Sequence, residues 1–262
     1  MLKEYLLSLA DAFRSKLGIT GKINAQNFPD KVKEVYDKGK DDEWSEFWDS
    51  IQTSGSSPAN YDYKFRGTAW NDNTFRPKYD IVPSGGGGVE TFARSNIKDF
   101  EACLKKGGID GTGVILDLSK CTNANTMFAG SSVEILPEID VSKASLYNFC
   151  SGCTKLTTVR KIKLGSGKAL TSTAFPKCTA LANIVIEGTL NGTSSFQDSP
   201  LSKESIISVI EALSDASEGQ TLTLKKTAVN TAFGIDVDDE TTYTDEWRNL
   251  RDSKANWTFA YA

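Results

Sequence analysis

The sequence predicts an α+β repeat solenoid with short strands, preceded by N-terminal helices and closed by a C-terminal helix–strand cap. A phrase built on phenylalanine recurs along the middle of the chain, and short apolar runs typical of strands follow its copies. Both ends carry apolar residues at helical spacing. We therefore expect N-terminal helices over 1–52, a linker over 53–60, a solenoid over 61–235 and a cap over 236–262.

Residues 1–52 contain two stretches with helical periodicity. The first places apolar side chains three or four residues apart and is followed by Gly18 as a C-cap. Its stripe consists of Leu2, Tyr5, Leu6, Leu9, Phe13 and Leu17. A second helix is expected from Pro29, because proline is tolerated at the first helical position. It ends on an apolar face that consists of Trp44, Phe47, Trp48 and Ile51.

The apolar face of the second helix leaves two interpretations open. Either the helices pack on each other or on the body of the chain, or the aromatic residues anchor self-association or docking. The polar linker over 53–60 favours self-association, because it lets the helices move away from the first coil. We therefore expect that any homo-oligomer forms through the N-terminal helices and not through the repeats.

The repeated phrase consists of a phenylalanine, a short link, a small residue, another short step and an aliphatic residue. Its copies begin at Phe65, Phe92, Phe128, Phe149, Phe175 and Phe196. In the first copy Thr68 takes the small position and Trp70 the aliphatic one. The spacings are 27, 36, 21, 26 and 21 residues. The shorter ones fall in the range of leucine-rich repeats, roughly 20–29 residues.

Strand-like runs follow the copies of the phrase, at 114–118, 133–136, 158–164 and 182–187. Strands this short are not stable alone. Stacked coils are therefore expected to bury the repeated phenylalanine, small and aliphatic residues in one continuous core.

The cysteines are expected to be reduced and buried. They are Cys103, Cys121, Cys150, Cys153 and Cys178, an odd number in a chain too long for a disulfide scaffold. Cys153 and Cys178 hold the small position where other copies have Ser131 and Ser199, which indicates a packing role. The Cys150-x-x-Cys153 spacing also occurs in redox and metal motifs, but no second ligand pair accompanies it, so we favour the structural interpretation.

The C-terminal part is predicted to close the solenoid. We expect a helix over 202–216, a strand over 221–224 and a partial copy of the repeat over 228–233. Thr244 is expected to N-cap a last helix, with Trp247 and Leu250 facing inward, and 257–259 to form an edge strand.

Composition excludes several function classes. The net charge of −4 opposes nucleic-acid binding, and the densest lysines, Lys161, Lys163 and Lys168, are expected at solvated strand and loop positions. The absence of histidine removes Ser–His–Asp and Cys–His nucleophile systems. We expect no catalytic residue, cofactor or metal. A polysaccharide-acting enzyme stays an alternative without a motif, because the densest acidic cluster, 236–240, is expected to be a solvated loop.

Two resemblances suggest what the chain does. The phrase Phe175-Pro-Lys-Cys178-Thr-Ala-Leu181-Ala-Asn-Ile184 resembles the BspA-like leucine-rich repeats over residues 61–235. The N-terminal phrase, Leu9-Ala-Asp-Ala-Phe-Arg-Ser-Lys-Leu-Gly followed by Lys22-Ile-Asn-Ala-Gln-Asn-Phe28, resembles a segment of tail and fibre proteins of phages and prophages of Gram-positive bacteria. These likenesses imply a recognition or structural module that associates with other tail proteins and contacts a host. A bacterial surface adhesin is the alternative.

The ligand is expected to be a protein or a surface glycan. An aromatic cluster near the first coil is the candidate binding platform, with core packing as the competing interpretation; it consists of Tyr61, Tyr63, Trp70 and Tyr79. Charges interrupt the N-terminal apolar run, and no run has the ~20 residues that span a bilayer. We therefore expect neither signal peptide nor membrane insertion, and a location in the cytoplasm before release or on the virion.

Overall fold

The chain falls into two compact units, Met1–Ser56 and Ser57–Ala262. The computed structural model describes residues 2–18, 20, 31, 48, 60–108, 111–165, 174–215 and 219–262. In the first unit helix α1 spans Leu2–Leu17, and Phe13 on its predicted stripe is buried. The predicted second helix lies outside the described residues, except that Lys31 and Trp48 are helical.

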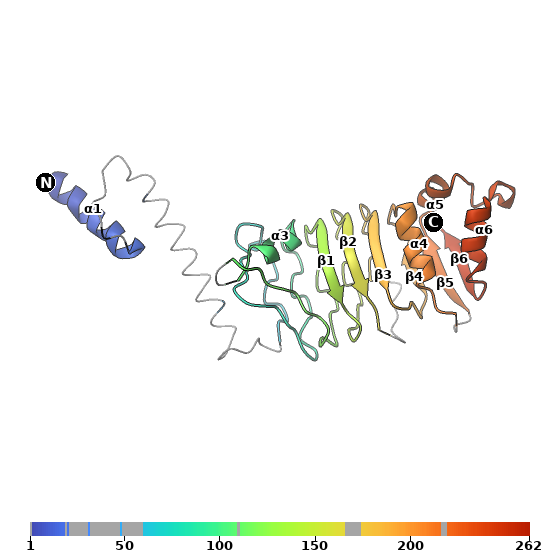
Figure 1. Cartoon of the computed structure of the whole chain (residues 1–262), viewed down its shortest axis with the longest axis horizontal. Coiled ribbons are helices and arrows are strands. Elements are labelled where there is room, and N and C mark those ends of the chain that lie inside the picture. The colour runs from blue at the N-terminus through green and yellow to red at the C-terminus, as the bar shows by residue number, and fades with distance from the viewer. Residues whose placement is uncertain are drawn as a thin grey trace. The chain divides into compact units, whose positions relative to one another are not determined.

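The second unit is a β-solenoid with a few short helices, in which successive coils stack along one axis (Figure 1). Its elements are α3 (Phe100–Lys105), β1 (Ile135–Asp140), β2 (Thr158–Lys163), β3 (Asn183–Glu187), β4 (Ser194–Phe196), α4 (Lys203–Glu211), β5 (Gln220–Leu224), α5 (Lys226–Phe233), η2 (Glu240–Thr242), α6 (Asp245–Asp252) and β6 (Trp257–Tyr261). None of the described helices combines the length and apolar character that crossing a bilayer requires.

Two parallel sheets carry the strands, in the orders β1-β2-β3 and β4-β5-β6. The register of the first sheet aligns buried residues of successive coils, Leu136 with Val159 and Val159 with Ile184. The strands expected over 133–136, 158–164, 182–187 and 221–224 are thus confirmed, with shifted ends. The edge strand expected over 257–259 is also confirmed, as β6.

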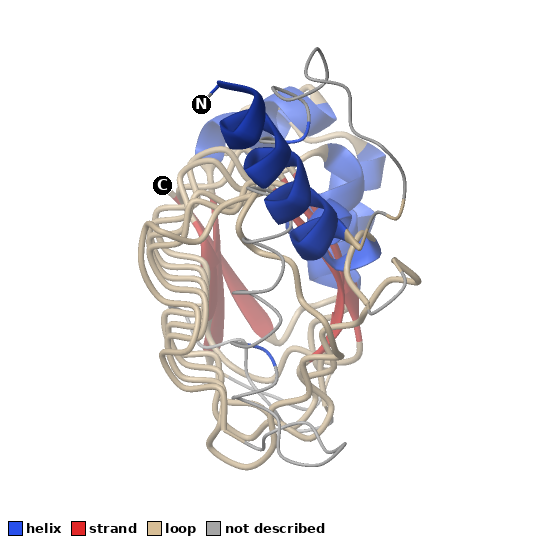
Figure 2. Ribbon diagram, turned by 90° about the vertical axis from the view of Figure 1, so that its left-hand side faces the viewer, coloured by secondary structure: helices blue, strands red, loops and turns tan. Residues whose placement is uncertain are grey.

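The repeated phenylalanines form one buried ladder, as predicted. Successive ring centroids lie 5.3 Å (Phe65–Phe92), 5.1 Å (Phe92–Phe128), 5.4 Å (Phe128–Phe149), 6.3 Å (Phe149–Phe175) and 6.0 Å (Phe175–Phe196) apart. Backbone bonds join the turns that carry them, for example from Phe92 N to Met127 O at 2.7 Å. Figure 2, which looks along the stack, shows loops of successive coils superimposed along one side.

Five of the six turns of the ladder, all except that of Phe196, include a left-handed residue shortly after the phenylalanine. Two residues after the phenylalanine, Gly67, Arg94, Gly130 and Lys177 all have positive φ, and Gly152 does so in the copy with one extra residue. Glycine adopts this conformation without steric cost, whereas Arg94 and Lys177, both at φ 60°, do not.

The small position of the phrase is a hydrogen-bond position as well as a packing position. The Cys153 thiol donates to Phe128 O at 2.9 Å, and the Cys178 thiol donates to Cys150 O at 3.1 Å. The Ser199 hydroxyl donates to Cys178 O at 3.2 Å, in the same direction along the stack. Cysteine and serine can replace each other at this position because a thiol or a hydroxyl can donate to a backbone carbonyl of the preceding coil. All five cysteines are free and buried, as expected.

Helix α4 takes the place of a fourth strand beside β3. The N–H of Ile184 donates to the Ser205 hydroxyl and the N–H of Ile186 to the Ser208 hydroxyl, both at 2.9 Å. Ser202 caps the helix by accepting from Ser205 N. Two serine hydroxyls on one face of α4 therefore accept hydrogen bonds from backbone N–H groups at the edge of the sheet.

Side chains of the first coil likewise accept backbone N–H groups of the coil that follows it. Three aspartates accept backbone N–H groups of the second coil, namely Asp62 from Val89 (2.6 Å), Asp72 from Lys98 (2.6 Å) and Asp80 from Ile115 (3.0 Å).

Three local predictions were wrong. The run 114–118 makes one isolated bridge, Ile81 to Leu116, because Pro83 lacks the N–H that the next rung requires. The partial repeat over 228–233 belongs to helix α5, whose C-cap Gly234 is left-handed. Thr68, assigned to a small core position, is exposed.

The last helix forms as predicted. Thr244 caps α6 by accepting from Trp247 N, and Trp247 is fully buried.

Candidate functional site

The predicted aromatic platform does not form one surface. Tyr61 and Trp70 lie in the core with Phe65, at 0% and 8% exposure. Tyr63 is 54% exposed, and the guanidinium of Arg66 lies 5.9 Å from its ring centroid. Tyr79 is partly exposed beneath the ammonium of Lys78. Ligand binding here stays a prediction that only Tyr63 and Tyr79 are placed to support.

The predicted oligomer face is described at one residue only. Trp48 is buried, at 1% exposure. Trp44, Phe47 and Ile51 lie outside the described residues.

The outer surface of the first sheet carries an array of opposite charges, which we call the ionic face. It consists of Glu138, Asp140, Lys161, Lys163 and Glu187. Three of these residues directly follow a buried or half-buried isoleucine at equivalent places in successive strands: Asp140, Lys163 and Glu187. The strand period turns each isoleucine inward and the following charge outward.

An irregularity in β2 adds a further outward charge. The register between β2 and β3 shifts between Val159 and Ile162, both of which are buried. Two residues between them, Arg160 and Lys161, therefore both face away from the core. Arg160 reaches Glu101 on α3 at 3.1 Å, while Lys161 joins the ionic face.

Ion pairs cross the ionic face from strand to strand. Lys161 Nζ lies 2.8 Å from Glu138 and 3.5 Å from Glu187. Lys163 Nζ lies 3.4 Å from Asp140 and 4.0 Å from Glu187. The two lysines are therefore largely compensated by three carboxylates.

The electrostatics of the ionic face favour the charged forms of Lys161 and Asp140. The hydrogen bond to Glu138 raises the pKa of Lys161. Burial would raise the pKa of Asp140, but hydrogen bonds from Ser142 and Lys163 outweigh it, and the net pKa lies below its ordinary value. Lys161 and Asp140 therefore stay ionised at neutral pH.

A shallow depression runs along the edge of the ionic face. The segment 115–117 lines one side, and residues of β1 and β2 together with Glu187 of β3 line the rest. Ile115 is 58% exposed here, and Val185 on β3 is 50% exposed. The surface thus combines fixed charges with apolar side chains, the mixture that orients a bound ligand.

The described cysteines are buried and differ in their electrostatics. The side-chain hydrogen bond with Cys150 lowers the pKa of Cys153, but Cys153 has no exposed surface at which a substrate could meet it. Burial raises the pKa of Cys150 and Cys178, and it raises that of Cys103 to about 11. These thiols therefore remain protonated at neutral pH. Within the described ranges, no three acidic or cysteine side chains gather in a way that could hold a metal ion.

Comparison with known proteins gives no relative: no family model, curated protein or solved structure matches this chain.

The sequence does not reveal the ionic face directly, because each of its acidic residues is unremarkable on its own. Lys161 and Lys163 drew attention only as dense lysines, and they are solvated strand residues as expected. The available signal was the charge that follows isoleucine in each strand, alternating Asp140, Lys163, Glu187. Lys168 lies outside the described residues.

Proposed function

We propose that the chain is a non-catalytic recognition module of BspA-like leucine-rich-repeat type. In this proposal it belongs to a phage or prophage tail and binds a protein or glycan of the host surface through the ionic face. One observation carries the assignment of the surface: a continuous parallel sheet holds compensated charges and exposed apolar residues in fixed register. The tail association rests on the N-terminal phrase alone.

The electrostatics support recognition over polysaccharide hydrolysis. A glycosidase needs a carboxyl with a raised pKa as its general acid. Among the described carboxyls with shifted pKa values, those of Glu101, Asp140 and Asp239 all lie below the ordinary value. Their hydrogen bonds stabilise the ionised form, which is unsuited to donating a proton.

Binding to intact cells tests the proposal. Labelled full-length protein would be applied to a panel of Gram-positive strains and counted by flow cytometry. We expect a subset of strains to bind, Lys161→Ala and Glu138→Ala to weaken binding, and Lys155→Ala, an exposed lysine outside the face, to bind like the wild type. Unchanged binding by both face variants, or cleavage of wall polysaccharide by the purified protein, would refute it.

We further propose that any homo-oligomer forms through the N-terminal segment. Light scattering on the full chain and on a chain beginning at Ser57 would compare their masses, since the second compact unit begins there. An oligomer that survives the truncation would contradict this assignment.

A further inference from the structure

Strand β6 forms an outer edge of the second sheet. The order β4-β5-β6 leaves no described strand on its far side. Ala262 shows which residues face β5, because its N–H donates to Leu224 O at 3.1 Å and its carbonyl accepts from Lys226 N at 2.8 Å. The alternation of a parallel ladder therefore turns the backbone N–H and C=O groups of Thr258 and Ala260 toward β5 as well.

The other residues of the strand, Phe259 and Tyr261, turn their backbone groups to the free edge. Among the described residues neither N–H group has a hydrogen-bond partner. Edge strands usually carry a charge, a proline or a bulge that prevents pairing with another chain. The β6 sequence, Trp-Thr-Phe-Ala-Tyr, has no charge or proline, and its five residues pair with β5 in unbroken register.

Elsewhere in the stack, polar side chains cover the backbone where strand pairing ends. The hydroxyls of Ser205 and Ser208 accept N–H groups beside β3, and the carboxylate of Asp80 accepts the N–H of Ile115. No side chain in the described ranges does the same for the free edge of β6. The stack can therefore accept a further strand at this edge.

A groove follows the free edge. On the β6 side it is lined by Trp257, Phe259 and Tyr261, whereas Thr258 and Ala260 do not line it. The groove thus lies against the residues whose backbone groups point away from β5.

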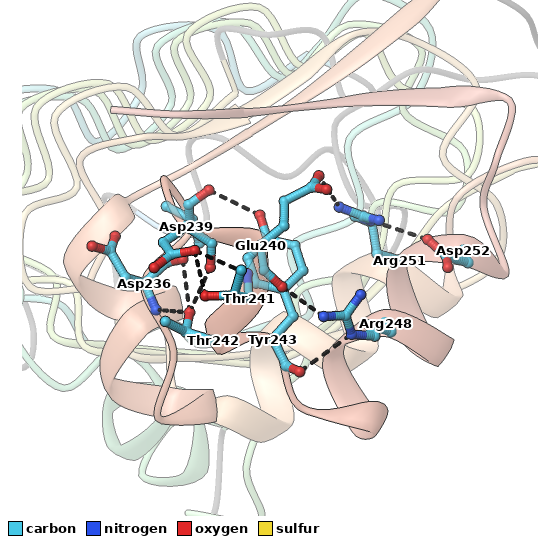
Figure 3. A network of polar contacts seen from close by, with 10 residues as sticks. Asp236, Asp239, Glu240, Thr241, Thr242, Tyr243, Arg248, Arg251 and Asp252 are labelled. Atoms are coloured by element: carbon cyan, nitrogen blue, oxygen red, sulfur yellow. Dashed lines mark hydrogen bonds and ion pairs between the residues drawn. The ribbon is translucent and has the colours of Figure 1, made fainter.

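The opposite wall of the groove consists of the loop that contains η2 and the end of α6 (Figure 3). Arg251 donates to Glu240 at 3.3 Å and to Asp252 at 3.0 Å. Arg248 donates to the backbone carbonyl of Glu240 at 2.6 Å. These bonds join the loop to the helix, so the wall is in place before a partner arrives.

The rim of the groove is acidic. The side chains of Glu240 and Asp252 are 74% and 63% exposed, whereas Arg251 between them is only 26% exposed. The same loop carries Asp236 and Asp239, which are also exposed. A second copy pairing through its own β6 would bring two such rims together, and like charges oppose that contact. A basic segment of another protein complements the rim.

We propose that β6 takes an extended peptide segment of another protein as a further strand, with lysine or arginine flanking its apolar residues. The N–H groups of Phe259 and Tyr261 donate to peptide carbonyls, and their carbonyls accept from peptide N–H groups. Alternate peptide side chains pack on the rings of the groove, while the basic ones face Glu240 and Asp252. This edge is separate from the ionic face, and the proposal does not depend on that face.

Fluorescence anisotropy of labelled peptides with the full-length protein tests the proposal. The probes are Lys-Thr-X-Thr-X-Thr-Lys peptides in which X is valine, isoleucine, phenylalanine or tyrosine, and the controls replace both lysines by glutamate. We expect at least one lysine peptide to bind and its glutamate counterpart to bind more weakly.

N-methylation of the bound peptide distinguishes backbone pairing from side-chain contact. Methyl groups on one alternate set of peptide nitrogens should weaken binding roughly five- to a hundredfold, the cost of leaving a backbone hydrogen bond unmade. Methyl groups on the other set, whose N–H groups face away from β6, should leave binding nearly unchanged.

A pair of variants tests the protein side of the same hydrogen bonds. Phe259→Pro removes an N–H that faces the free edge, where a strand tolerates proline. Phe259→Ala loses the same ring but keeps the N–H, so it is the matched control. We expect Phe259→Pro to bind roughly two- to tenfold more weakly than Phe259→Ala, the net effect of one hydrogen bond. Far-UV circular dichroism reports whether both variants are folded.

Amide hydrogen exchange measured by NMR needs no variant. In the free protein the N–H groups of Phe259 and Tyr261 should exchange faster than those of Thr258 and Ala260, and saturating peptide should slow them. The proposal is overturned by absence of binding to every lysine peptide, by equal binding of the glutamate peptides, by equal losses from the two methylation patterns, or by protection of Phe259 and Tyr261 before peptide is added. None of these results depends on the cell-binding assay of the ionic face, so the two proposals fail independently.

Discussion

Replacing Ser205 by alanine tests whether helix α4 acts as the fourth strand of the first sheet. The Ser205 side chain is 4% exposed and accepts the N–H of Ile184, which is itself buried. Alanine removes the acceptor without adding bulk. The Ile184 N–H is then left without a partner at a place that water does not reach.

The expected loss follows from this burial. An unsatisfied buried donor costs about 1–3 kcal/mol. Alanine recovers up to ~0.5 kcal/mol through its higher helix propensity. The net destabilisation is then about 1–2 kcal/mol, which lowers Tm by roughly 2–8 °C in a domain of this size. Ser208→Ala is the matched control, since Ser208 is half-buried and water can replace its bond to Ile186. We expect it to lose no more than ~0.5 kcal/mol.

Thermal and urea unfolding, followed by circular dichroism, would measure both variants beside the wild type. The reasoning predicts a clearly larger loss for Ser205→Ala than for Ser208→Ala. Equal losses would show that exposure does not decide the cost, and an unchanged Ser205→Ala would show that the helix does not satisfy the sheet edge.

Three further predictions concern the ladder and its surface. Arg94→Gly should raise the free energy of unfolding by about 0.5–1 kcal/mol, because glycine adopts the left-handed conformation at φ 60° without strain. Arg66→Gly is the control: φ is not positive at Arg66, so this variant should gain no stability. A lower free energy of unfolding for Arg94→Gly would contradict the argument. Cys178→Ser should be tolerated because its hydroxyl can still donate to Cys150 O. Cys178→Ala removes this donor and should lower the free energy of unfolding in urea by about 1–3 kcal/mol. Equal losses in the two variants would contradict a donor role for Cys178. Hydrogen bonds from Lys105 and Arg160 hold the pKa of Glu101 below its ordinary 4.5. The contribution of this carboxylate to folding stability is therefore complete above its unfolded pKa, and it is lost as pH falls through its lower folded pKa. Glu101→Gln should then flatten the acid limb of a plot of Tm against pH. An unchanged acid limb would refute this.

The sequence predicted the interior of the solenoid better than its ends. The phenylalanine and small positions recur with fixed chemistry, so their ladder from Phe65 to Phe196 could be found by comparing segments of one chain. The side chains that hydrogen-bond to the backbone at the ends of the stack do not recur along the chain. The carboxylate of Asp80 accepts the N–H of Ile115, and nothing local to either residue shows that they are neighbours. The helical serines beside β3 are likewise visible only once the coils are stacked.

The candidate sites were hard to predict for a related reason. Aromatic rings near the first coil are compatible with a binding platform, yet large apolar rings are equally typical of a core. Tyr61 and Trp70 are core residues, because they pack around the first phenylalanine of the ladder. Predicting the ionic face required the register of three strands, which composition does not give.

The groups that hold the coils together are not the side chains of the outer face, and this separation supports recognition on that face. Stacking is maintained by backbone bonds, by buried phenylalanines and by inward thiols and hydroxyls, none of which involve the side chains of Lys161 or Lys163. Exposed ion pairs contribute at most ~1 kcal/mol each, so the fold does not depend on the ionic face. Its residues can therefore change with little loss of stability, which is what a surface that must follow a changing ligand requires. An interior that tolerates few changes beneath a face that tolerates many is consistent with a recognition module. It gives a direct comparison: Lys161→Ala, which only removes exposed ion pairs, should leave Tm nearly unchanged, whereas Ser205→Ala should lower it by the amount worked out above.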